Sequence, residues 1–466
     1  MLHPLTDSED GAPIPLIPIR ADALSAWLET QAGLVQTWLT QTGFKAKPGT
    51  VALIPDAAGA LAGVLIGIGR DDGENGGIWT WAALPERLPD GTYRLDDTAT
   101  PVDAGSVALG WALGAYGFDR YKKIDKSPAV LVWPAGCDRA HVTRTAEAVF
   151  LVRDLINTPA SDNGPEELAA AGTELFKKHR GRSKVIVGAD LLAENFPAIH
   201  AVGRASDRAP RLFDGVWGDE TAPKITLVGK GVCFDTGGLD LKSAAGMKLM
   251  KKDMGGGAHA FGLASMIMDA GLPVRLRVLV PAVENSVAGN AMRPMDIVQT
   301  RKGLSVEIGN TDAEGRVILA DALAEAAAET PDVLIDFATL TGAARVALGT
   351  DLPALFCNDD GLAAGLLDHG VRLNDPLWRL PLWAPYRKMI EGKIADINNA
   401  PEGGYAGAIT AALFLEAFVE KDIPWAHIDL MAWNVKSRPG RPEGGEAMGI
   451  RALYGYLAER FDPAGR

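Results

Sequence analysis

The chain has 466 residues, enough for two or three domains, and 47% of them are hydrophobic, so a large core can form and extensive disorder is excluded. The net charge of −13 argues against generic binding to nucleic acids or to anionic membrane surfaces. The three cysteines, Cys137, Cys233 and Cys357, are widely spaced and odd in number, which favours a reducing compartment over a disulfide framework.

No targeting segment is visible in the sequence. The first ten residues lack the basic and apolar regions of a signal peptide. The longest near-apolar stretch, residues 57–69, is too short and too rich in glycine to cross a bilayer. We therefore expect a cytoplasmic protein.

The first 150 residues mix short apolar runs with turns and helical stretches. Residues 51–54, 63–68 and 129–133 are predicted to be strands, and Asp71-Asp72-Gly73 and Asp90-Gly91 to be turns. An apolar pattern over residues 141–156 predicts a helix that ends before Pro159. We expect a small N-terminal α/β domain with a linker helix over residues 1–150, followed by a larger domain over residues 151–466.

The larger domain shows the alternation typical of βαβ units. Helical stretches such as residues 258–270 and 317–329 separate strand-like runs at residues 184–187, 225–228, 274–280, 333–337, 354–357 and 426–431. The pattern predicts an α/β fold with a mixed, mainly parallel sheet covered by helices. Sites in such sheets lie beyond the C-terminal ends of the strands, and Lys230 and Thr339 both follow predicted strands.

An acidic motif, Asn310-Thr311-Asp312-Ala313-Glu314-Gly315-Arg316, precedes the predicted helix at residues 317–329. On an extended backbone, Asp312, Glu314 and Arg316 would share one face. Two carboxylates aimed at one point repel each other unless a cation lies between them. The alternative is an acidic turn that caps the helix.

A glycine-rich segment at residues 228–238 carries Lys230 and Asp235, and Asp253 follows further along the chain. With Asp312 and Glu314 these residues offer four carboxylates and one amine, a plausible shell for two divalent metals about 3.5–4 Å apart. The alternative for Lys230 is a phosphate-binding lysine, but a Walker motif needs Ser or Thr next, where this chain has Gly231. His-Glu-x-x-His is absent, which excludes the common helical zinc-protease site.

Taken together, these motifs resemble those of the leucine aminopeptidase family of dimetal peptidases. The resemblance runs from about residue 154 to near the C-terminus and includes several separate motifs in the family's order and spacing. The first 150 residues carry no such motif. The motifs are Gly229-Lys230-Gly231 with Phe234-Asp235, Lys242, Asp253-Met254-Gly255-Gly256, the acidic motif at residues 310–316, and Ala338-Thr339-Leu340-Thr341-Gly342.

The resemblance implies specific roles. Lys230 and Asp253 would bind only the first of two metal ions, and Asp312 would bind only the second. Asp235 and Glu314 would bind both ions. Lys242 would stabilise the oxyanion of the tetrahedral intermediate, and Arg316 would hold a bicarbonate ion that acts as general base. Positions that line the substrate pocket in relatives correspond here to Met250, Asn310, Thr339, Leu340 and Gly342.

Several of these residues also have plainer interpretations. Lys242 could be a solvated surface lysine and Arg316 an ordinary helix-flanking charge. Met250 and Leu340 could be core residues, and we expect His259 to pack rather than to bind metal. One departure from many relatives is Lys248, where they have an acidic residue. Oxygen-rich shells favour magnesium or manganese, whereas the family uses zinc, often exchangeable with manganese, so the metal stays open.

The resemblance predicts a metal-dependent aminopeptidase that removes N-terminal residues from peptides by means of a metal-bridging hydroxide. It also implies a homo-hexamer. Some relatives have DNA-binding roles, but the net charge of −13 argues against a nucleic-acid partner here, and we expect no membrane partner. The rival hypotheses are another carboxylate dimetal hydrolase, such as a phosphoesterase, and a non-catalytic regulatory protein on the same fold.

Overall fold

The computed structural model describes residues 4–8, 11–69, 77–124 and 127–462, which form two units. The first unit contains residues 1–150 together with Lys436–Glu443, and the second contains Leu151–Val435 and residues 444–466. Among the described residues, no helix is both long enough and apolar enough to cross a membrane.

The first unit is built on a six-stranded sheet in the order β1-β6-β5-β2-β4-β3. All neighbours are parallel except β3 and β4, which form an antiparallel pair. The strands predicted at residues 51–54, 63–68 and 129–133 are confirmed as β3, β4 and β6, whereas the predicted turn at Asp71-Asp72-Gly73 lies outside the described residues. The elements are β1 (Leu5–Thr6), β2 (Ile14–Ile19), α1 (Leu24–Glu29), α2 (Gly33–Gln41), β3 (Val51–Pro55), β4 (Leu61–Gly67), α3 (Ile78–Ala82), α4 (Leu84–Arg87), β5 (Thr92–Leu95), α5 (Ala104–Gly114) and β6 (Val130–Val132).

The second unit contains a mixed sheet of nine strands. Its main path runs β16-β15-β18-β14-β9-β11-β8-β7, and β10 pairs with the end of β11. The central strands β18, β14, β9, β11 and β10 run parallel, and β7 and β8 are antiparallel to their neighbours. Strand β15 is antiparallel to β18 but parallel to β16. The mixed, mainly parallel sheet is therefore confirmed. Its strands are β7 (Arg182–Val187), β8 (Arg211–Trp217), β9 (Lys224–Gly229), β10 (Gly231–Asp235), β11 (Arg275–Asn285), β14 (Val333–Ala338), β15 (Ala354–Cys357), β16 (Trp378–Arg379) and β18 (Trp425–Asp429).

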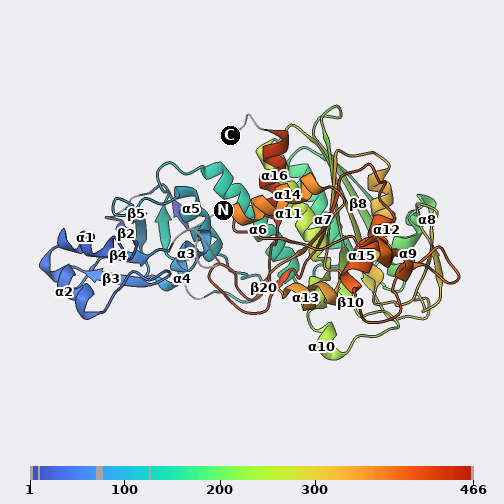
Figure 1. Ribbon diagram of the computed structural model, residues 1–466, viewed down its shortest axis with the longest axis horizontal. Helices are drawn as coiled ribbons and strands as arrows, with labels where there is room; N and C mark the ends of the chain where they lie inside the picture. Colours follow the sequence, from blue (N-terminus) through green and yellow to red (C-terminus); the bar gives the residue numbers. More distant parts are fainter. Residues whose placement is uncertain (1–3, 9–10, 70–76, 125–126, 463–466) are drawn as a thin grey trace. The chain divides into compact units, whose positions relative to one another are not determined.

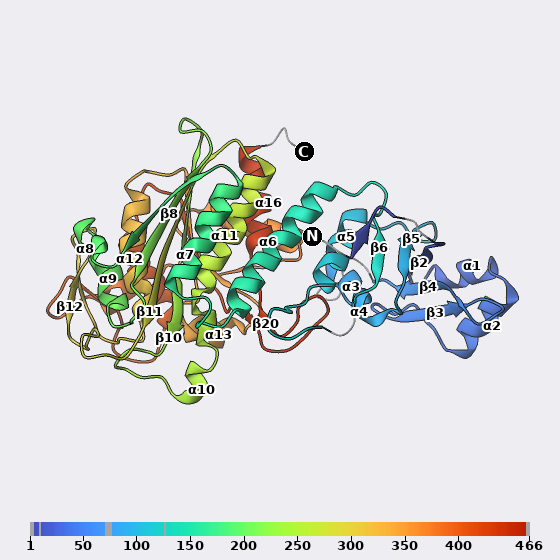
Figure 2. The same ribbon diagram turned by 180° about the vertical axis from the view of Figure 1, so that it is seen from behind.

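Helices cover both faces of this sheet (Figures 1 and 2). One face packs against α7, α11, α14 and α16, and the other against α9, α12 and α15. The apolar side chains of α9, α12 and α15 form the main buried cluster together with those of the strands. The remaining elements of the chain are α6 (Arg139–Asn157), α7 (Pro165–Lys178), α8 (Asp190–Ala193), α9 (Pro197–Gly203), α10 (Ala244–Met247), η1 (Met250–Met254), α11 (Gly255–Ala270), β12 (Ile297–Gln299), β13 (Ser305–Glu307), α12 (Glu314–Ala327), α13 (Gly342–Leu348), α14 (Asp360–Arg372), η2 (Ala384–Ile390), β17 (Ile397–Asn398), α15 (Gly407–Glu416), β19 (Trp433–Asn434), β20 (Gly444–Gly445) and α16 (Ile450–Phe461).

The parallel strands place several polar residues at one edge of the sheet. Lys230 directly follows β9, Asp235 ends β10, Asn285 ends β11, Thr339 follows β14 and Asp429 ends β18. The C-terminal ends of parallel strands meet at the same edge, where ligand sites of α/β proteins lie. The fold therefore gathers these residues although they are far apart in the sequence.

Candidate metal centre

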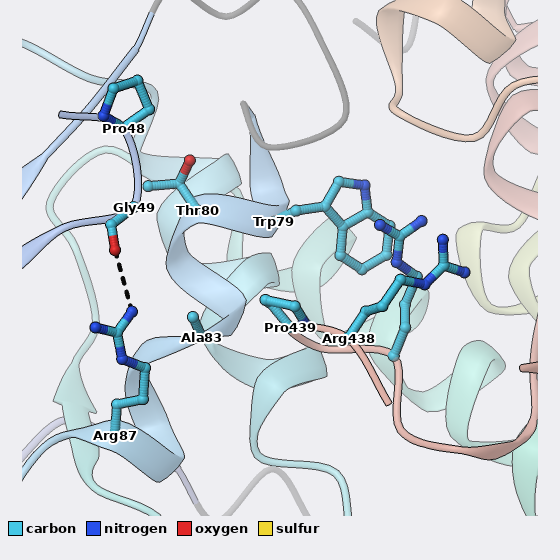
Figure 3. Close-up of a pocket in the computed structure, with 9 residues that line it drawn as sticks. Pro48, Gly49, Trp79, Thr80, Ala83, Arg87, Arg438 and Pro439 are labelled. Atoms are coloured by element: carbon cyan, nitrogen blue, oxygen red, sulfur yellow. Dashed lines mark hydrogen bonds between the residues drawn. The ribbon is translucent and has the colours of Figure 1, made fainter. Parts of the chain in front are cut away.

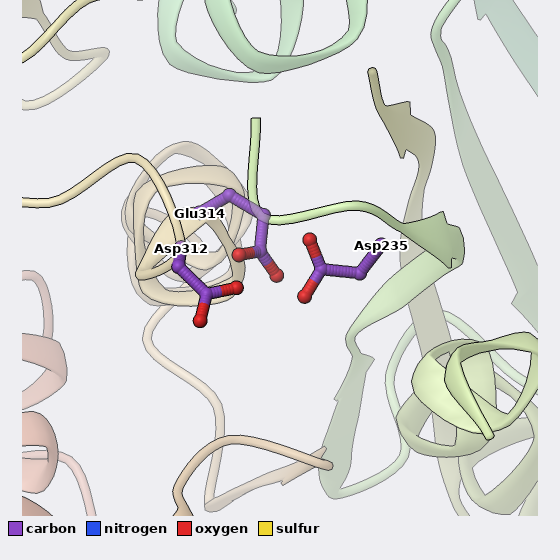
Figure 4. A group of neighbouring side chains, drawn as sticks. All are labelled: Asp235, Asp312 and Glu314. Carbon is purple, nitrogen blue, oxygen red and sulfur yellow. The ribbon is translucent and has the colours of Figure 1, made fainter. Parts of the chain in front are cut away.

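Three carboxylates converge at this edge: Asp235, Asp312 and Glu314 (Figure 4). One oxygen from each lies within 4.8 Å of the others, which is close enough for all three to touch one cation. Asp235 comes from the end of β10, Asp312 from a loop and Glu314 from the first residue of α12. Asp235 and Glu314 are buried, whereas Asp312 is partly exposed.

Lys230 contacts both Glu314 and a fourth carboxylate, that of Asp253. Its Nζ lies 2.7 Å from Asp253 Oδ2 and 3.0 Å from Glu314 Oε1, and it donates a hydrogen bond to the carbonyl oxygen of Thr339 at 3.1 Å. Asp253 sits in the short helix η1 and accepts a hydrogen bond from Thr339 Oγ1 at 2.8 Å. The five predicted ligands therefore form one contiguous group.

Lys242 points into the same group instead of into solvent. Its Nζ lies 2.7 Å from Asp235 Oδ2 and also contacts Asp312 Oδ1. Burial lowers the pKa of Lys242, but Asp235 and Asp312 outweigh that effect and the net shift is upward. Lys242 is therefore a cation beside the carboxylates at neutral pH, and the interpretation as a surface lysine is wrong.

The backbone over residues 312–316 is not extended, so the shared face that an extended backbone would give Asp312, Glu314 and Arg316 does not form. Helix α12 begins at Glu314, so Glu314 and Arg316 lie in its first turn and only Asp312 precedes the helix. Asp312 and Glu314 still converge because the turn before the helix brings Asp312 back toward the helix N-terminus. A Cβ on Gly315 would lie 2.4 Å from Lys230 Cε, so glycine is needed there for Lys230 to reach the carboxylates.

The electrostatics of the group fit a bound cation. Burial and the nearby Asp235 carboxylate raise the pKa of Glu314 to about 8, which shows how costly the crowded negative charges are. Asp253 Oδ2 and Glu314 Oε1 are fully buried, and both oxygens face the same cationic group, Lys230 Nζ. A donor set of carboxylates with one amine suits divalent ions, so the residues present fit a metal centre.

Arg316 lies two residues after Glu314 in α12 and is buried, with 8% of its surface exposed. Its Nη1 donates to the carbonyl oxygen of Asn399 at 2.6 Å, whereas Nε has no hydrogen-bond partner among the described residues. Burial lowers the pKa of Arg316 to about 10, and no carboxylate of the described residues forms an ion pair with it. A buried guanidinium of this kind can bind a small anion.

Of the predicted substrate-pocket residues, Thr339 and Asn310 contact predicted metal ligands. Thr339 is buried and contacts Asp253, and Leu340 packs partly against the core while its N–H donates to Asp429 at 3.0 Å. Asn310 is exposed and its Oδ1 accepts a hydrogen bond from the Asp312 N–H at 2.8 Å. Met250 begins η1 and is half-buried, and Gly342 is exposed at the start of α13.

Several residues of the site are missing from the sequence-based prediction. Asn285 donates hydrogen bonds to Asp235 and to the turn at Thr311. Asn399 accepts from the Gly309 and Asn310 N–H groups and donates to the Asn310 carbonyl oxygen. Asp429 accepts from Leu340, from Thr341 N–H and from Thr341 Oγ1. The strand-end rule could have found Asn285 and Asp429, but no sequence signal marks Asn399.

Two further residues singled out from the sequence lie outside the metal centre. His259 is fully buried, contacts the Gly255 carbonyl oxygen through Nδ1 at 2.6 Å and accepts a hydrogen bond from Met448 N–H through Nε2. Burial lowers the pKa of His259 to about 4, so it is a neutral packing residue, as expected. Lys248 is exposed.

The first unit has a separate cavity of about 350 Å³ (Figure 3). Within it, Arg87 donates to the Gly49 carbonyl oxygen at 3.1 Å, and the Arg441 guanidinium lies 4.2 Å from the centre of the Trp79 ring. None of the predicted site residues lines this cavity, whose walls are formed by Pro48, Gly49, Trp79, Thr80, Ala83, Arg87, Arg438, Pro439 and Arg441.

Comparisons with known proteins agree with this architecture over nearly the whole chain. Residues 150–454 match the model of the cytosol aminopeptidase family catalytic domain, and residues 14–134 match that of the M17 aminopeptidase N-terminal domain. A probable cytosol aminopeptidase of Roseiflexus castenholzii is 41% identical over 383 residues, which cover 78% of each chain.

Two solved structures extend the comparison. The crystal structure of the cytosol aminopeptidase from Coxiella burnetii is 50% identical, with a TM-score of 0.94, and the match covers 98% of this chain and 100% of that one. The bottromycin maturation enzyme BotP in complex with Mn is 34% identical, with a TM-score of 0.86, over 97% of this chain and 100% of that one.

Proposed function

The chain belongs to the cytosol aminopeptidase family and is a metal-dependent aminopeptidase, and from this premise we propose that two divalent ions work at the carboxylate group. The observation that carries the proposal is the contiguity of Lys230, Asp235, Asp253, Asp312 and Glu314 within one buried group. Lys230 and Asp253 would hold one ion, Asp312 the other, and Asp235 and Glu314 both. Asp235, Asp312 and Glu314 form one cluster whose oxygens lie within 4.8 Å of one another, whereas Asp253 lies against Lys230, so a second ion would use that pair.

The bound ions would polarise the scissile carbonyl and lower the pKa of a water so that it attacks at neutral pH. Lys230 must lose a proton to act as a ligand, because an ammonium has no lone pair, and metal binding can supply the necessary free energy. Lys242 keeps its proton and points toward Asp235 and Asp312, where it can donate to the oxyanion that develops on the substrate carbonyl. By the family resemblance, the residues that would line the substrate pocket are Thr339, Leu340, Gly342, Met250 and Asn310.

We propose that Arg316 binds bicarbonate, which would accept the proton of the attacking water. The support is a buried guanidinium whose Nε has no hydrogen-bond partner in the described part of the chain. No histidine lies among the contacts of the carboxylate group described above. An anion on Arg316 would therefore supply the base that these residues lack.

The direct test is hydrolysis of leucine p-nitroanilide by demetallated and reconstituted protein, with and without added bicarbonate. Chelation should abolish activity, manganese or zinc should restore it, and bicarbonate should raise kcat. Full activity in a thoroughly demetallated sample would refute the metal mechanism. If kcat does not change when bicarbonate is added, only the proposed binding of bicarbonate by Arg316 is refuted.

Four broader properties follow the family resemblance. Zinc or manganese is the proposed metal, and the Mn complex of BotP favours trying manganese first. We propose a cytoplasmic homo-hexamer, as the names of the curated relatives and the resemblance suggest. We also propose that residues 151–466 carry the catalysis and that residues 1–150 form the N-terminal domain.

A further inference from the structure

Asn285 contacts the carboxylate group from the end of β11, the strand that pairs with β10. It is the last residue of β11 and pairs in register with Asp235, the last residue of β10. Its side chain is buried, with the residue only 4% exposed. The parallel pairing of the two strands therefore fixes where the Asn285 amide lies relative to the Asp235 carboxylate.

The Asn285 amide nitrogen faces three oxygens. Nδ2 lies 2.8 Å from Asp235 Oδ1, 3.1 Å from the Thr311 carbonyl oxygen and 3.5 Å from Glu314 Oε2. All three partners are acceptors, so only the NH2 end of the amide can point toward them. Asn285 therefore faces the carboxylates with its amide nitrogen, which acts there as a hydrogen-bond donor and not as a metal ligand.

The backbone of Asn285 fixes the amide in place. Its carbonyl oxygen accepts hydrogen bonds from Thr236 N–H at 3.0 Å and from Thr236 Oγ1 at 2.8 Å. On the other side, a Cβ on Gly238 would lie 2.9 Å from Asn285 Oδ1, so the glycine leaves room for the amide. The amide has little freedom to rotate away from the carboxylates.

We propose that Asn285 is a positioning residue that sets the spacing and orientation of Asp235 and Glu314 for metal binding. This inference rests on the proposed two-ion centre, in which these two carboxylates contact both ions. One amide joins the end of β10, the turn at Thr311 and the start of α12, which together carry three of the five proposed ligands. Groups that hydrogen-bond to metal ligands typically change metal affinity about 10- to 100-fold when they are removed.

The test measures Mn²⁺ binding to demetallated protein through the electron paramagnetic resonance signal of free Mn²⁺. Asn285→Ala should raise the Mn²⁺ concentration at half-saturation about 10- to 100-fold. Asn163→Ala is a matched control, because Asn163 is also 4% exposed and donates to a carbonyl oxygen, that of Leu155, at 2.8 Å away from the carboxylates. It should bind Mn²⁺ like the unmodified protein.

Each outcome decides a different claim. If the unmodified protein binds no Mn²⁺, the proposed function fails. If it binds Mn²⁺ and Asn285→Ala binds equally well, only the positioning role is overturned. Asn285→Ser, which cannot reach all three acceptors, should weaken binding in the same direction. If both variants fail to fold while Asn163→Ala folds, the amide serves the fold itself and the proposal is likewise overturned.

Discussion

At the scale of single residues, Glu314 and Lys242 are neighbours with different proposed tasks. Glu314 is buried and contacts Lys230, whereas Lys242 contacts Asp235 and Asp312 from the more open side. Replacing Glu314 with Ala should lower metal content and activity together. Replacing Lys242 with Ala should leave the metals bound and lower kcat about 10²- to 10³-fold, with little change in KM. Metal analysis beside steady-state kinetics measures both effects.

Lys248→Ala is the matched control for this pair of variants, since Lys248 is an exposed lysine only six positions from Lys242. It should behave like the unmodified protein. A Lys242→Ala variant that loses its metals, or that keeps a near-normal kcat, would show that Lys242 has another role.

The sequence was informative about residues that carry unusual chemistry. Four acidic side chains and one lysine in glycine-rich surroundings pointed to the ligand group, and the fold brings all five together. Asn285 was missed because the strand was predicted to end at residue 280, whereas β11 runs to Asn285, and Asn399 was missed because no sequence signal marks it. Their importance arises from strand register and from a hydrogen bond across some 90 positions in the chain, as between Asn399 and Gly309.

At the scale of elements, α12 shows that a local sequence pattern can predict a helix without predicting the residue at which it begins. Its Ala- and Leu-rich sequence predicted the helix, but the start at Glu314 was not visible, because Ala313 makes no side-chain cap. The glycine-rich segment after β9 likewise contains a full strand, β10, whose pairing with β11 could not be inferred from composition. Strand β8 was also missed.

Helix α12 also carries a pH-sensitive contact with another element. Asp321 is fully buried and accepts hydrogen bonds from Ala198 N–H and Ile199 N–H at the start of α9, and from Arg301 N–H. Burial outweighs these donors and raises the pKa of Asp321 from 3.8 to about 7. The folded protein therefore retains a proton on Asp321 that the unfolded chain releases near pH 4.

The sign of the resulting pH dependence follows from this difference. The stabilisation by protonated Asp321 is fully present below about pH 4 and is lost as the pH rises to about 7, with a limiting slope of about 1.4 kcal/mol per pH unit. Asp321→Asn should flatten this fall in the free energy of unfolding between pH 4 and 7. Thermal unfolding midpoints across this range measure it.

Asp219→Asn is the control for the pH series. Asp219 is exposed, and its hydrogen bonds with Thr221 lower its pKa, so its contribution lies below this pH window. If Asp321→Asn and Asp219→Asn show the same slope as the unmodified protein, Asp321 is not the group that titrates.

At the scale of the whole molecule, the alternation of strands and helices was enough to predict two α/β units and parallel βαβ units in the second, but not which strands are antiparallel. Apolar runs such as residues 333–337 are buried strands, and β-sheet geometry then places their ends together. The sequence of the first unit offered no motif, yet it matches the family's N-terminal domain. Its role was not predictable because recognisable chemistry is confined to the second unit.

Native mass spectrometry of the metal-loaded protein tests the central claim most directly, because it counts metal ions and chains in one particle. We expect six chains of 49.2 kDa with two divalent ions per chain, and loss of those ions after chelation. A particle of another size with two ions per chain would contradict only the proposed hexamer. A fully active protein with one ion per chain, or with none, would contradict the two-ion centre.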